Sequence, residues 1–577
     1  MYKKNEIVVL KFGSSVLRDR NDLPRAVHEI YRWWRRGVQV VAVCSAFGNT
    51  TDELLKSAEN LCEQPDRSIL ATLLATGEAT SSALLGLALN RTGIRAQVLD
   101  PAQAGLRTVG GTLDADLISV NVARLKGDLR SSVVVLPGFV GRGENGNTTL
   151  LGRGGSDLTA LFIAHRLNAQ CVLLKDVDGV YASDPAISTT RPLRFAELKF
   201  ETALKVSNKL VQAKAIRFAA HYGLKFTVTA IGSAYETVVG SNTDRLEFSR
   251  ADRPPLRVAL VGCGNIGGGV YQALTSLPEL FTVTGVATLT NERARAAGVP
   301  EALISDSAAE LIDNDCDVVV ELIGGTKEAS TVVSRALRAG RHVVTANKAL
   351  IAIEGKRMST LAADAALTLV YSAAVGGGMP ALEAIEQARV VGQIESITGV
   401  LNGTTNFVLS RLAEGHSLKA AVELARAAGY TEANSRLDLN GTDVAHKLVL
   451  LARHAFSLPL QFDDIERVSL EDIDPDWVRE RAFHGEGVRF VAMCKQVEDK
   501  LVASIKPTVL PQNNPLANTR DVDNCLIVKL KSGAFFTVTG KGAGRWPTTE
   551  AVVADLLDIK RDLQRQAEAI NEKEVCA

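Results

Sequence analysis

The sequence predicts an α/β protein built from more than one domain. Apolar runs with the length of buried strands alternate with helical stretches over the first 245 residues, and a second alternating series begins at Leu256. At 577 residues the chain is also too long for a single hydrophobic core. We therefore expect two α/β blocks.

The first block is expected to be a sandwich of sheet and helices. Strand-like runs alternate there with helical segments, of which residues 23–36 are the clearest. The predicted strands are residues 7–10, 38–43, 133–136, 172–174 and 226–228. The block ends in residues 244–255, where both periodicities stop and Pro254 and Pro255 stiffen the chain.

The second block has the pattern of a doubly wound sheet that binds a dinucleotide. Its predicted strands are residues 256–261, 283–287, 318–322 and 342–345. The first of them runs directly into G-x-G-x-x-G, and residues 268–274 then read as a helix. The glycines permit a tight turn, a close approach to pyrophosphate and close packing of helix on strand. The residues expected to bind the cofactor are Gly262, Gly264, Asn265, Ile266 and Gly267.

The choice between NAD and NADP stays open. The second strand ends in residues 286–290 without the carboxylate that is typical of NAD sites, so nothing there repels a 2′-phosphate. Arg293 and Arg295 follow closely and slightly favour NADP, although arginines in such places are often only a solvated helix face.

Composition excludes several classes of function. The chain has 65 basic and 65 acidic residues and no long basic cluster, which argues against nucleic acid as a partner. The apolar runs are shorter than a membrane span, and residues 1–10 lack the pattern of a signal peptide. The eight cysteines have no zinc-binding spacing. We expect a cytoplasmic enzyme with reduced thiols and small-molecule substrates, without nucleic-acid or membrane partners.

Asp443 and Lys447 are the first candidate catalytic pair. They are four residues apart in a predicted helix, so that both side chains lie on one face. Reduction of an aldehyde needs a cation or proton donor at the oxygen where charge develops, and lysine can be either. An ordinary surface ion pair is the alternative reading of the same spacing.

Seven segments, in this order, resemble the homoserine dehydrogenase family over residues 256–560. They are residues 262–267, 321–325, 345–348, 374–380, 401–406, 438–447 and 542–548. The resemblance implies oxidation or reduction between aspartate 4-semialdehyde and homoserine. It places Lys447 and Lys348 near the reacting oxygen, with Asp443 orienting Lys447. It also assigns further residues to substrate (Glu432, Asp438) and to cofactor (Thr345, Gly544).

The same resemblance implies a monovalent cation, for example Na⁺, held by backbone carbonyls. The carbonyls would be those of Val375, Gly377 and Met379. Ser372 stands where the family usually has glutamate, and residues 432–437 lack the prolines and one carboxylate common in that loop. Cation binding and substrate affinity are therefore expected to differ from the family pattern.

The N-terminal block has features of phosphate chemistry but no P-loop spacing. Lys11 and the glycine turn after it follow the first strand, where a cation and backbone N–H groups can meet a triphosphate. Residues 152–157 combine Arg153 and Asp157 with a glycine-rich turn. Taken singly, each feature also fits a tight turn or a surface salt bridge.

Together these segments resemble the amino-acid kinase family, in its aspartate kinase branch, across residues 5–240. Further matches are residues 45–51, 76–78, 176–181 and 184–185. The resemblance implies ATP with Mg²⁺, and Lys11 stabilising the transferring phosphoryl group. The residues implied to bind aspartate are Ser45, Thr50, Glu78, Arg153 and Asp157, and those implied to meet ATP are Lys11, Gly13, Ser14, Asp176, Tyr181 and Lys209.

This block also departs from the family pattern. The loop after Lys11 is one residue shorter than usual, and Ala186 replaces an arginine. Shifts of about 1 Å at a phosphate loop can cost a hundredfold in rate. The regulatory (ACT) domains that usually separate kinase and dehydrogenase are missing, because only about a dozen linker residues lie between the blocks. We therefore do not expect threonine or lysine to inhibit by that route.

The predicted layout has five parts: a kinase-like domain (residues 1–245), a linker (246–255), a Rossmann domain (256–375), a catalytic and dimerisation domain (376–545) and a C-terminal helix returning to the cofactor domain (546–577). Homo-oligomers are expected by resemblance. Three hypotheses follow: a working bifunctional enzyme, a dehydrogenase whose N-terminal block only senses nucleotide or dimerises, and a kinase for another acid such as glutamate.

Overall fold

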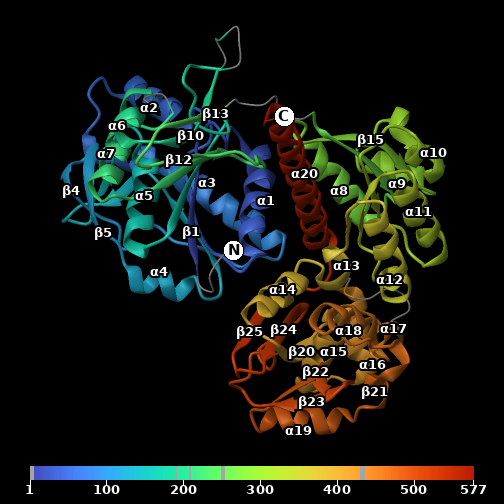
Figure 1. Ribbon diagram of the computed structural model, residues 1–577. Coiled ribbons are helices and arrows are strands. Elements are labelled where there is room, and N and C mark those ends of the chain that lie inside the picture. Colours follow the sequence, from blue (N-terminus) through green and yellow to red (C-terminus); the bar gives the residue numbers. More distant parts are fainter. Residues whose placement is uncertain are drawn as a thin grey trace. The chain divides into compact units, whose positions relative to one another are not determined.

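The computed structural model describes residues 6–185, 188, 192–206, 210–247, 254–428, 430 and 436–576. It divides the chain into two compact units (Figure 1). The first comprises Met1–Pro254 together with Lys560–Ala577, and the second is Pro255–Ile559. Each unit has its own sheets and its own hydrophobic core, as the sequence predicts.

The first unit is built on a nine-stranded sheet. In spatial order the strands are β13 (Arg245–Glu247), β10 (Arg194–Leu198), β12 (Thr237–Val239), β11 (Phe226–Ala230), β9 (Gln170–Lys175), β1 (Ile7–Phe12), β2 (Gln39–Cys44), β6 (Val133–Pro137) and β3 (Ala96–Val98). The central pairs β9–β1, β1–β2 and β2–β6 are parallel. Their carboxyl ends therefore lie along one edge of the sheet, where ligands of such folds bind.

Helices cover both faces of this sheet. Figure 1 shows α1 (Leu23–Trp34) and α3 (Arg67–Arg91) on one side of the strands, and α5 (Gly155–Leu167) and α7 (Ala213–His221) on the other. The core beneath α5 and α7 joins their buried apolar residues to alternate residues of the strands, such as Val9, Val41 and Leu173. The shorter helices are α2 (Thr50–Leu61), α4 (Val122–Asp128) and α6 (Phe200–Val206).

A small second sheet completes the first unit. Its strands in spatial order are β5 (Asp114–Ser119), β4 (Arg107–Gly111), β7 (Val140–Arg142) and β8 (Thr148–Leu150). The helix α3 is long and apolar enough to cross a membrane by length and composition alone, and 44% of its most apolar window is buried inside the protein. Because α3 packs on α1 and on the strands β2 and β6, we interpret it as a core helix.

The second unit begins with a six-stranded parallel sheet. In spatial order the strands are β16 (Ile304–Ser305), β15 (Phe281–Ala287), β14 (Leu256–Val261), β17 (Val318–Glu321), β18 (His342–Thr345) and β19 (Leu369–Val370). The chain winds outward in both directions from β14, which is the doubly wound order. Its helices are α8 (Asn265–Thr275), α9 (Asn291–Ala296), α10 (Ala308–Asp313), α11 (Lys327–Arg338) and α12 (Lys348–Asp364).

A second six-stranded sheet, mostly antiparallel, follows in the same unit. Its spatial order is β21 (Ile465–Arg467), β23 (Lys500–Leu510), β22 (Gly487–Val497), β20 (Ile394–Val400), β24 (Asp523–Leu530) and β25 (Phe535–Lys541). The largest core of the unit lies between this sheet and its helices. Those helices are α13 (Ser372–Gly376), α14 (Ala381–Val391), α15 (Gly403–Ala413), α16 (Leu418–Ala427), α17 (Arg436–Leu439), α18 (Thr442–Ala455) and α19 (Pro475–Phe483).

The last helix, α20 (Arg545–Cys576), belongs partly to each unit. Its first turn lies against α8, where Arg545 donates to the side-chain oxygen of Gln272 over 2.9 Å. From Lys560 onward its residues group with the first unit, which the sequence did not predict. Lys560 donates to the carbonyl of Pro254, and buried Arg561 is paired with buried Glu29. These long-range contacts, not local periodicity, decide where the helix end belongs.

Candidate active sites

The dinucleotide loop follows β14 as the sequence predicts. Gly262 has φ +107°, and a Cβ there would lie 2.7 Å from the carbonyl oxygen of Leu322. A Cβ at Gly267 would lie only 2.0 Å from the carbonyl oxygen of Gly262, so both positions require glycine. At Gly264 no described atom lies within 4 Å of an added Cβ, which leaves the backbone open to a ligand. Since α8 begins at Asn265, its N-terminal N–H groups face this space, and the loop fits a pyrophosphate.

A buried carboxylate connects the loops that follow β17 and β18. Glu321, at the end of β17, is fully buried, and burial raises its pKa. Its carboxylate accepts a hydrogen bond from the backbone N–H of Ile323 at 2.8 Å and another from the hydroxyl of Thr345. Asn347 donates to the carbonyls of Ile323 (3.1 Å) and Gly325 (2.7 Å). These bonds join the loops after β17 and β18.

Asn347 also determines where Lys348 lies. Its side-chain oxygen accepts from the N–H of Leu350 at 3.1 Å and so caps α12, whose first residue is Lys348. Because α12 starts at this point, the ammonium group of Lys348 forms an ion pair with the carboxylate of Asp443, 95 residues later in the chain. Two candidate residues from distant segments therefore meet.

The carboxylate of Asp443 lies between two ammonium groups. Its Oδ2 is 3.1 Å from Nζ of Lys447 and accepts a hydrogen bond from the amide of Asn402 at 3.0 Å, while its Oδ1 contacts Lys348. The same Asn402 amide donates to Asp438 at 2.8 Å. Burial alone would raise the pKa of Asp443, but the lysine ammonium groups outweigh it and lower that pKa. Asp443 therefore stays ionised.

The two lysines differ in environment. Lys447 is buried, with its side chain 6% exposed, and it donates to the carbonyl of Leu401 at 2.7 Å. Burial lowers its pKa, and the positive charge of Lys348 lowers it further. The side chain of Lys348 is 40% exposed. Lys447 is thus a rigid cation with a weakened hold on its proton, and Lys348 is a more accessible one.

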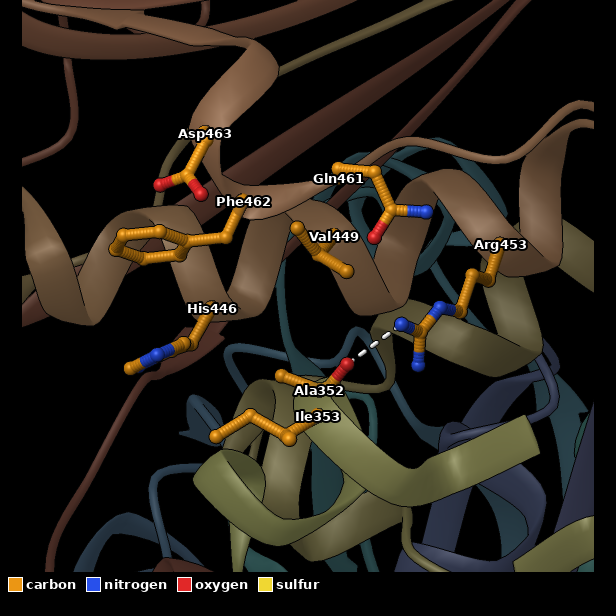
Figure 2. Close-up of a pocket in the computed structure, with 8 residues that line it drawn as sticks. All are labelled: Ala352, Ile353, His446, Val449, Arg453, Gln461, Phe462 and Asp463. Carbon is orange, nitrogen blue, oxygen red and sulfur yellow. Dashed lines mark hydrogen bonds between the residues drawn. The ribbon is translucent and has the colours of Figure 1, made fainter. Parts of the chain in front are cut away.

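A pocket of about 290 Å³ lies beside this cluster, between α12 and α18 (Figure 2). Arg453 spans it by donating to the carbonyls of Ile351 (2.8 Å) and Ala352 (2.5 Å). His446 lines the pocket and stacks near Phe462, with ring centroids 4.9 Å apart, and burial lowers its pKa. Neither Lys348 nor Lys447 is among the lining residues, so the pocket is separate from the cluster around Asp443.

Another cluster of charged residues lies in the first unit, at the carboxyl ends of its central strands. Nζ of Lys11, near the end of β1, lies 2.8 Å from Oδ1 of Asp157 in the first turn of α5. Nζ of Lys175, the last residue of β9, lies 3.0 Å from Oδ2 of the same carboxylate. All three side chains are buried. Burial would raise the pKa of Asp157, but Lys11 and Lys175 lower it, so that it is ionised.

Glu78, on α3, lies near Lys11. Burial raises its pKa to about 7, and its Oε2 has no hydrogen-bond partner among the residues that the structure describes. The buried side chain of Ser45 is nearby, since the carbonyl of Ser45 accepts from the Ser81 hydroxyl at 2.7 Å. A buried carboxyl group with one oxygen unpartnered among the described residues is suited to a polar ligand.

Comparison with known proteins agrees with this geometry. Residues 262–371 match the family model for the NAD-binding domain of homoserine dehydrogenase, and residues 380–557 match the model for homoserine dehydrogenase. The homoserine dehydrogenase of Neisseria gonorrhoeae is 32% identical over 316 residues, which are 53% of this chain and 73% of that protein. The chain belongs to the homoserine dehydrogenase family.

Other homoserine dehydrogenases give the same result. That of Pseudomonas aeruginosa is 33% identical over 324 residues, covering 54% of this chain and 74% of that protein. The crystal structure of the enzyme from Thiobacillus denitrificans is 31% identical and covers 53% of this chain and 73% of that one, with a TM-score of 0.51.

The N-terminal residues 6–229 match the amino acid kinase family. The chain thus has the domain composition of a bifunctional enzyme of aspartate-family biosynthesis.

In this member of the homoserine dehydrogenase family the structure brings together most of the residues expected at the oxidoreductase site. Four of them form one cluster of hydrogen bonds and ion pairs with Asn402: Lys348, Asp438, Asp443 and Lys447. The hydroxyl of Thr345 donates to the carboxylate of Glu321. Glu432 falls outside the described residues. The proposed cation loop is partly helical, because α13 extends to Gly376. Gly544 has φ +124° immediately before α20.

The residues expected at the kinase site are less closely gathered. Lys11, Asp157 and Glu78 lie together, and Gly13 is so near that an added Cβ would be 3.0 Å from Nζ of Lys11. Arg153 and Asp176 are exposed, and the hydroxyl of Tyr181 donates to Asp178. Ser14 is exposed in the loop, and Thr50 begins α2. Lys209 and Ala186 lie outside the described residues.

Sequence reasoning missed three residues that the structure places in these sites. Asn402 and Asn347 lie within the segments that resemble the family, but no role was predicted for them from the sequence. Each follows a strand and precedes a helix, and this position could have indicated an N-cap. Lys175 was not singled out at all. Its only signal in the sequence was a lysine ending an apolar strand directly before Asp176.

Proposed function

We propose that this chain is a bifunctional enzyme: it reduces aspartate 4-semialdehyde to homoserine with NADPH or NADH, and it phosphorylates aspartate with ATP. The observation that carries the first activity is the buried pair Asp443 and Lys447, with Lys348 on the other carboxylate oxygen, in a member of the homoserine dehydrogenase family. The second rests on the cluster of Lys11, Asp157 and Glu78 in a domain of the amino acid kinase family.

The chemistry of the dehydrogenase follows from the environment of Lys447. When bound, the nicotinamide cofactor supplies the hydride. Negative charge then develops on the aldehyde oxygen, and a buried ammonium group held at 3.1 Å from Asp443 can stabilise that charge and donate a proton to it. Asp443 keeps Lys447 in place, and Lys348 adds a second positive charge at the open side. Asn402 prevents rotation of the carboxylate by binding the same oxygen as Lys447.

The end of β15 supports the use of NADP as well as NAD. This strand ends at Ala287, and the next apolar residue, Leu289, is 98% exposed. No acidic side chain stands at the strand end, and Arg293 is exposed at the start of α9. A 2′-phosphate near the start of α9 could pair with Arg293, although the exposed Glu292 lies directly before it.

The chemistry of the kinase would be positioning and charge neutralisation. Phosphoryl transfer to a carboxylate needs little covalent participation by the protein, and Mg²⁺ with cationic side chains neutralises the transferring group. Lys11 lies against the glycine turn, where backbone N–H groups and an ammonium group can bind the same phosphate. Burial raises the pKa of Glu78 to about 7, so that about half of these side chains are protonated at pH 7, and the protonated form can donate a hydrogen bond to an aspartate carboxylate.

Two assays on the purified full chain test the proposal. The first follows oxidation of NADPH and of NADH that depends on aspartate 4-semialdehyde. The second follows ADP formation that depends on aspartate, with Lys11→Ala as the control that should abolish it. Absence of aldehyde-dependent cofactor oxidation would refute the dehydrogenase assignment, and absence of aspartate-dependent ADP would refute the kinase assignment. Glutamate in place of aspartate tests the other acid substrate.

A second candidate role for the N-terminal unit is nucleotide binding without turnover. The observation that favours it is the shortened loop after Lys11, together with the engagement of both lysines by Asp157. In that case the chain would bind ATP but form no ADP in the presence of aspartate. A nucleotide titration beside the kinase assay separates the two roles.

We also propose a monovalent cation at the backbone carbonyls of Val375, Gly377 and Met379. Gly377 has φ +58°, which turns the chain sharply at this point. The carbonyl of Met379 accepts from the N–H of Ala381 at 2.8 Å and keeps a second lone pair. Dehydrogenase activity should then respond to Na⁺ at constant ionic strength, and equal rates with a large organic cation would refute the site.

A homo-oligomer is proposed through the second sheet of the second unit. Its edge strand β25 exposes Phe535, and a strand at the edge of a sheet with an exposed aromatic residue is suited to contact with a second copy. Light scattering of the purified chain measures its mass in solution. A monomer at micromolar concentration would contradict the proposal.

A further inference from the structure

Lys175 is a buried cation for which the reaction described above has no role. It ends β9, and β9 pairs in parallel with β1, so that Lys11 and Lys175 emerge at the same edge of the sheet. Their backbones are in adjacent strands, with Lys11 opposite Leu173. The topology therefore places two ammonium groups side by side where ligands of parallel sheets bind.

One carboxylate serves both ammonium groups. Nζ of Lys175 is 3.0 Å from Oδ2 and 3.3 Å from Oδ1 of Asp157, and Nζ of Lys11 is 2.8 Å from Oδ1. The side chains of both lysines are less than a tenth exposed. Burial and the neighbouring charge of Lys11 lower the pKa of Lys175, although Asp157 and the exposed Asp176 oppose this. Two ammonium groups and one buried carboxylate leave an excess positive charge, which costs free energy unless an anion is bound. Glu78, with a pKa near 7, offsets this charge only in part.

The surroundings indicate which anion fits. Lys11 lies under the glycine turn, because a Cβ at Gly13 would be 3.0 Å from its Nζ. A structural ion pair would need only one lysine for the carboxylate of Asp157. Here one buried carboxylate holds two lysines beside a glycine turn, at the carboxyl ends of β1 and β9. This arrangement can bind a group with several negatively charged oxygens, such as a phosphoryl group.

We propose that Lys175 is a second phosphoryl-binding cation of the N-terminal unit. With Lys11 it binds the γ-phosphoryl group of ATP, and Asp157 positions both ammonium groups instead of contacting aspartate. The inference rests on the proposed kinase function. In the transfer, a side-chain carboxylate oxygen of aspartate bonds to the γ-phosphorus while the bond to the β,γ-bridging oxygen breaks. The electron pair of that bond leaves with ADP, and no proton is transferred. The two lysines stabilise the charge on the equatorial oxygens.

A binding experiment decides the role of Lys175 whether or not the kinase turns over. The Mg²⁺ complexes of ADP and of the non-hydrolysable analogue AMP-PNP are titrated calorimetrically into the full chain and into Lys175→Met. We expect the substitution to weaken AMP-PNP by about tenfold or more and ADP much less, because only AMP-PNP carries the γ-phosphoryl group. Equal losses for both ligands, or none, would overturn the proposal. Retained ADP binding shows that the variant has folded.

A turnover experiment adds an independent test. Lys175→Met should lower kcat for aspartate-dependent ADP formation by about a hundredfold, the usual cost of losing one charge-stabilising group, and leave KM for aspartate nearly unchanged. Lys175→Arg, which keeps the charge, should recover part of the loss. Lys126→Met removes an exposed lysine of α4 in the same unit and should have no effect.

The outcomes distinguish a failure of the kinase function from a failure of the role of Lys175. If the unmodified chain forms no ADP, the proposed kinase function fails, and the nucleotide titration still decides whether Lys175 meets the γ-phosphoryl group. If the chain is active and Lys175→Met is equally active, the role of Lys175 is refuted and the kinase function stands. A raised KM for aspartate with unchanged kcat would assign Lys175 to the substrate and would also overturn the proposal.

Discussion

Asp443 and Lys447 lie one turn apart on α18, with 3.1 Å between Oδ2 and Nζ, and both side chains are more than nine-tenths buried. A pair on a solvated helix face would contribute little to stability or to chemistry. Here burial removes water from around the pair, and Asn402 and the carbonyl of Leu401 hold it in one geometry. The pair therefore holds the ammonium group of Lys447 in a fixed position, and a hydride-transfer site needs such a cation beside the oxygen where charge develops.

Lys447→Ala should lower kcat for semialdehyde reduction by about a hundred- to a thousandfold, because the oxygen loses its proton donor. The dissociation constant of NADPH should stay within about twofold, since Lys447 is not part of the dinucleotide loop. Steady-state kinetics and a fluorescence titration of cofactor measure the two effects. The control is Lys356→Ala, an exposed lysine on α12. Unchanged turnover in Lys447→Ala would contradict the site.

Asn347→Ala should impair catalysis through the position of Lys348. The substitution removes the cap of α12 and the bonds to the carbonyls of Ile323 and Gly325. Ser417→Ala is a matched control, because Ser417 caps α16 by accepting from the N–H of Ala420. Both should lose about 1 kcal/mol or more of stability. We expect only Asn347→Ala to lower kcat, by about tenfold, and equal kcat values in the two variants would be evidence against a positioning role.

Arg293 and Arg295 offer a paired test of cofactor selection. Arg295 is engaged with Glu301 at 2.7 and 2.9 Å, whereas Arg293 is exposed at the start of α9. Arg293→Ala should weaken NADPH about tenfold, the loss of one charged hydrogen bond to a phosphate, and should leave NADH unchanged. Arg295→Ala should change neither. Parallel titrations with both cofactors check this, and equal weakening of NADH by Arg293→Ala would rule out contact with the 2′-phosphate.

Glu78 should make the N-terminal unit less stable as the pH rises. Burial raises its folded pKa to about 7 from a usual value of 4.5, so the folded state binds a proton more tightly than the unfolded state between these values. The stability from the protonated form is fully present below pH 4.5 and is lost as the pH rises through 7. The full effect is on the order of 3 kcal/mol, at 1.36 kcal/mol per pKa unit.

Glu78→Gln should therefore raise the melting temperature more at pH 8 than at pH 5, because glutamine cannot ionise. Glu59→Gln, an exposed glutamate on α2, is the control and should show no such difference. Calorimetric scans of the full chain at the two pH values give the comparison. A gain that is the same at both pH values would mean that Glu78 titrates normally.

Local patterns in the sequence were enough for the fold class and for part of the dehydrogenase site. The strand, glycine turn and helix around Gly262 depend on neighbours in the chain, and the structure has them as β14 and α8. Asp443 and Lys447 share a helix face because of their four-residue spacing alone. Such features are decided within one or two turns of chain, so periodicity and turn chemistry predict them.

Contacts between distant segments were decided only by the tertiary structure. Lys348 meets Asp443 across 95 residues because Asn347 starts α12 beside α18. Lys175 meets Asp157 because α5 packs on both β9 and its neighbour β1, and strand order cannot be read from strand periodicity. The end of α20 joins the first unit through Arg561 and Glu29, more than 500 residues apart. The sequence by itself determined which side chains could act; the order and packing of the strands and helices determined which of them meet.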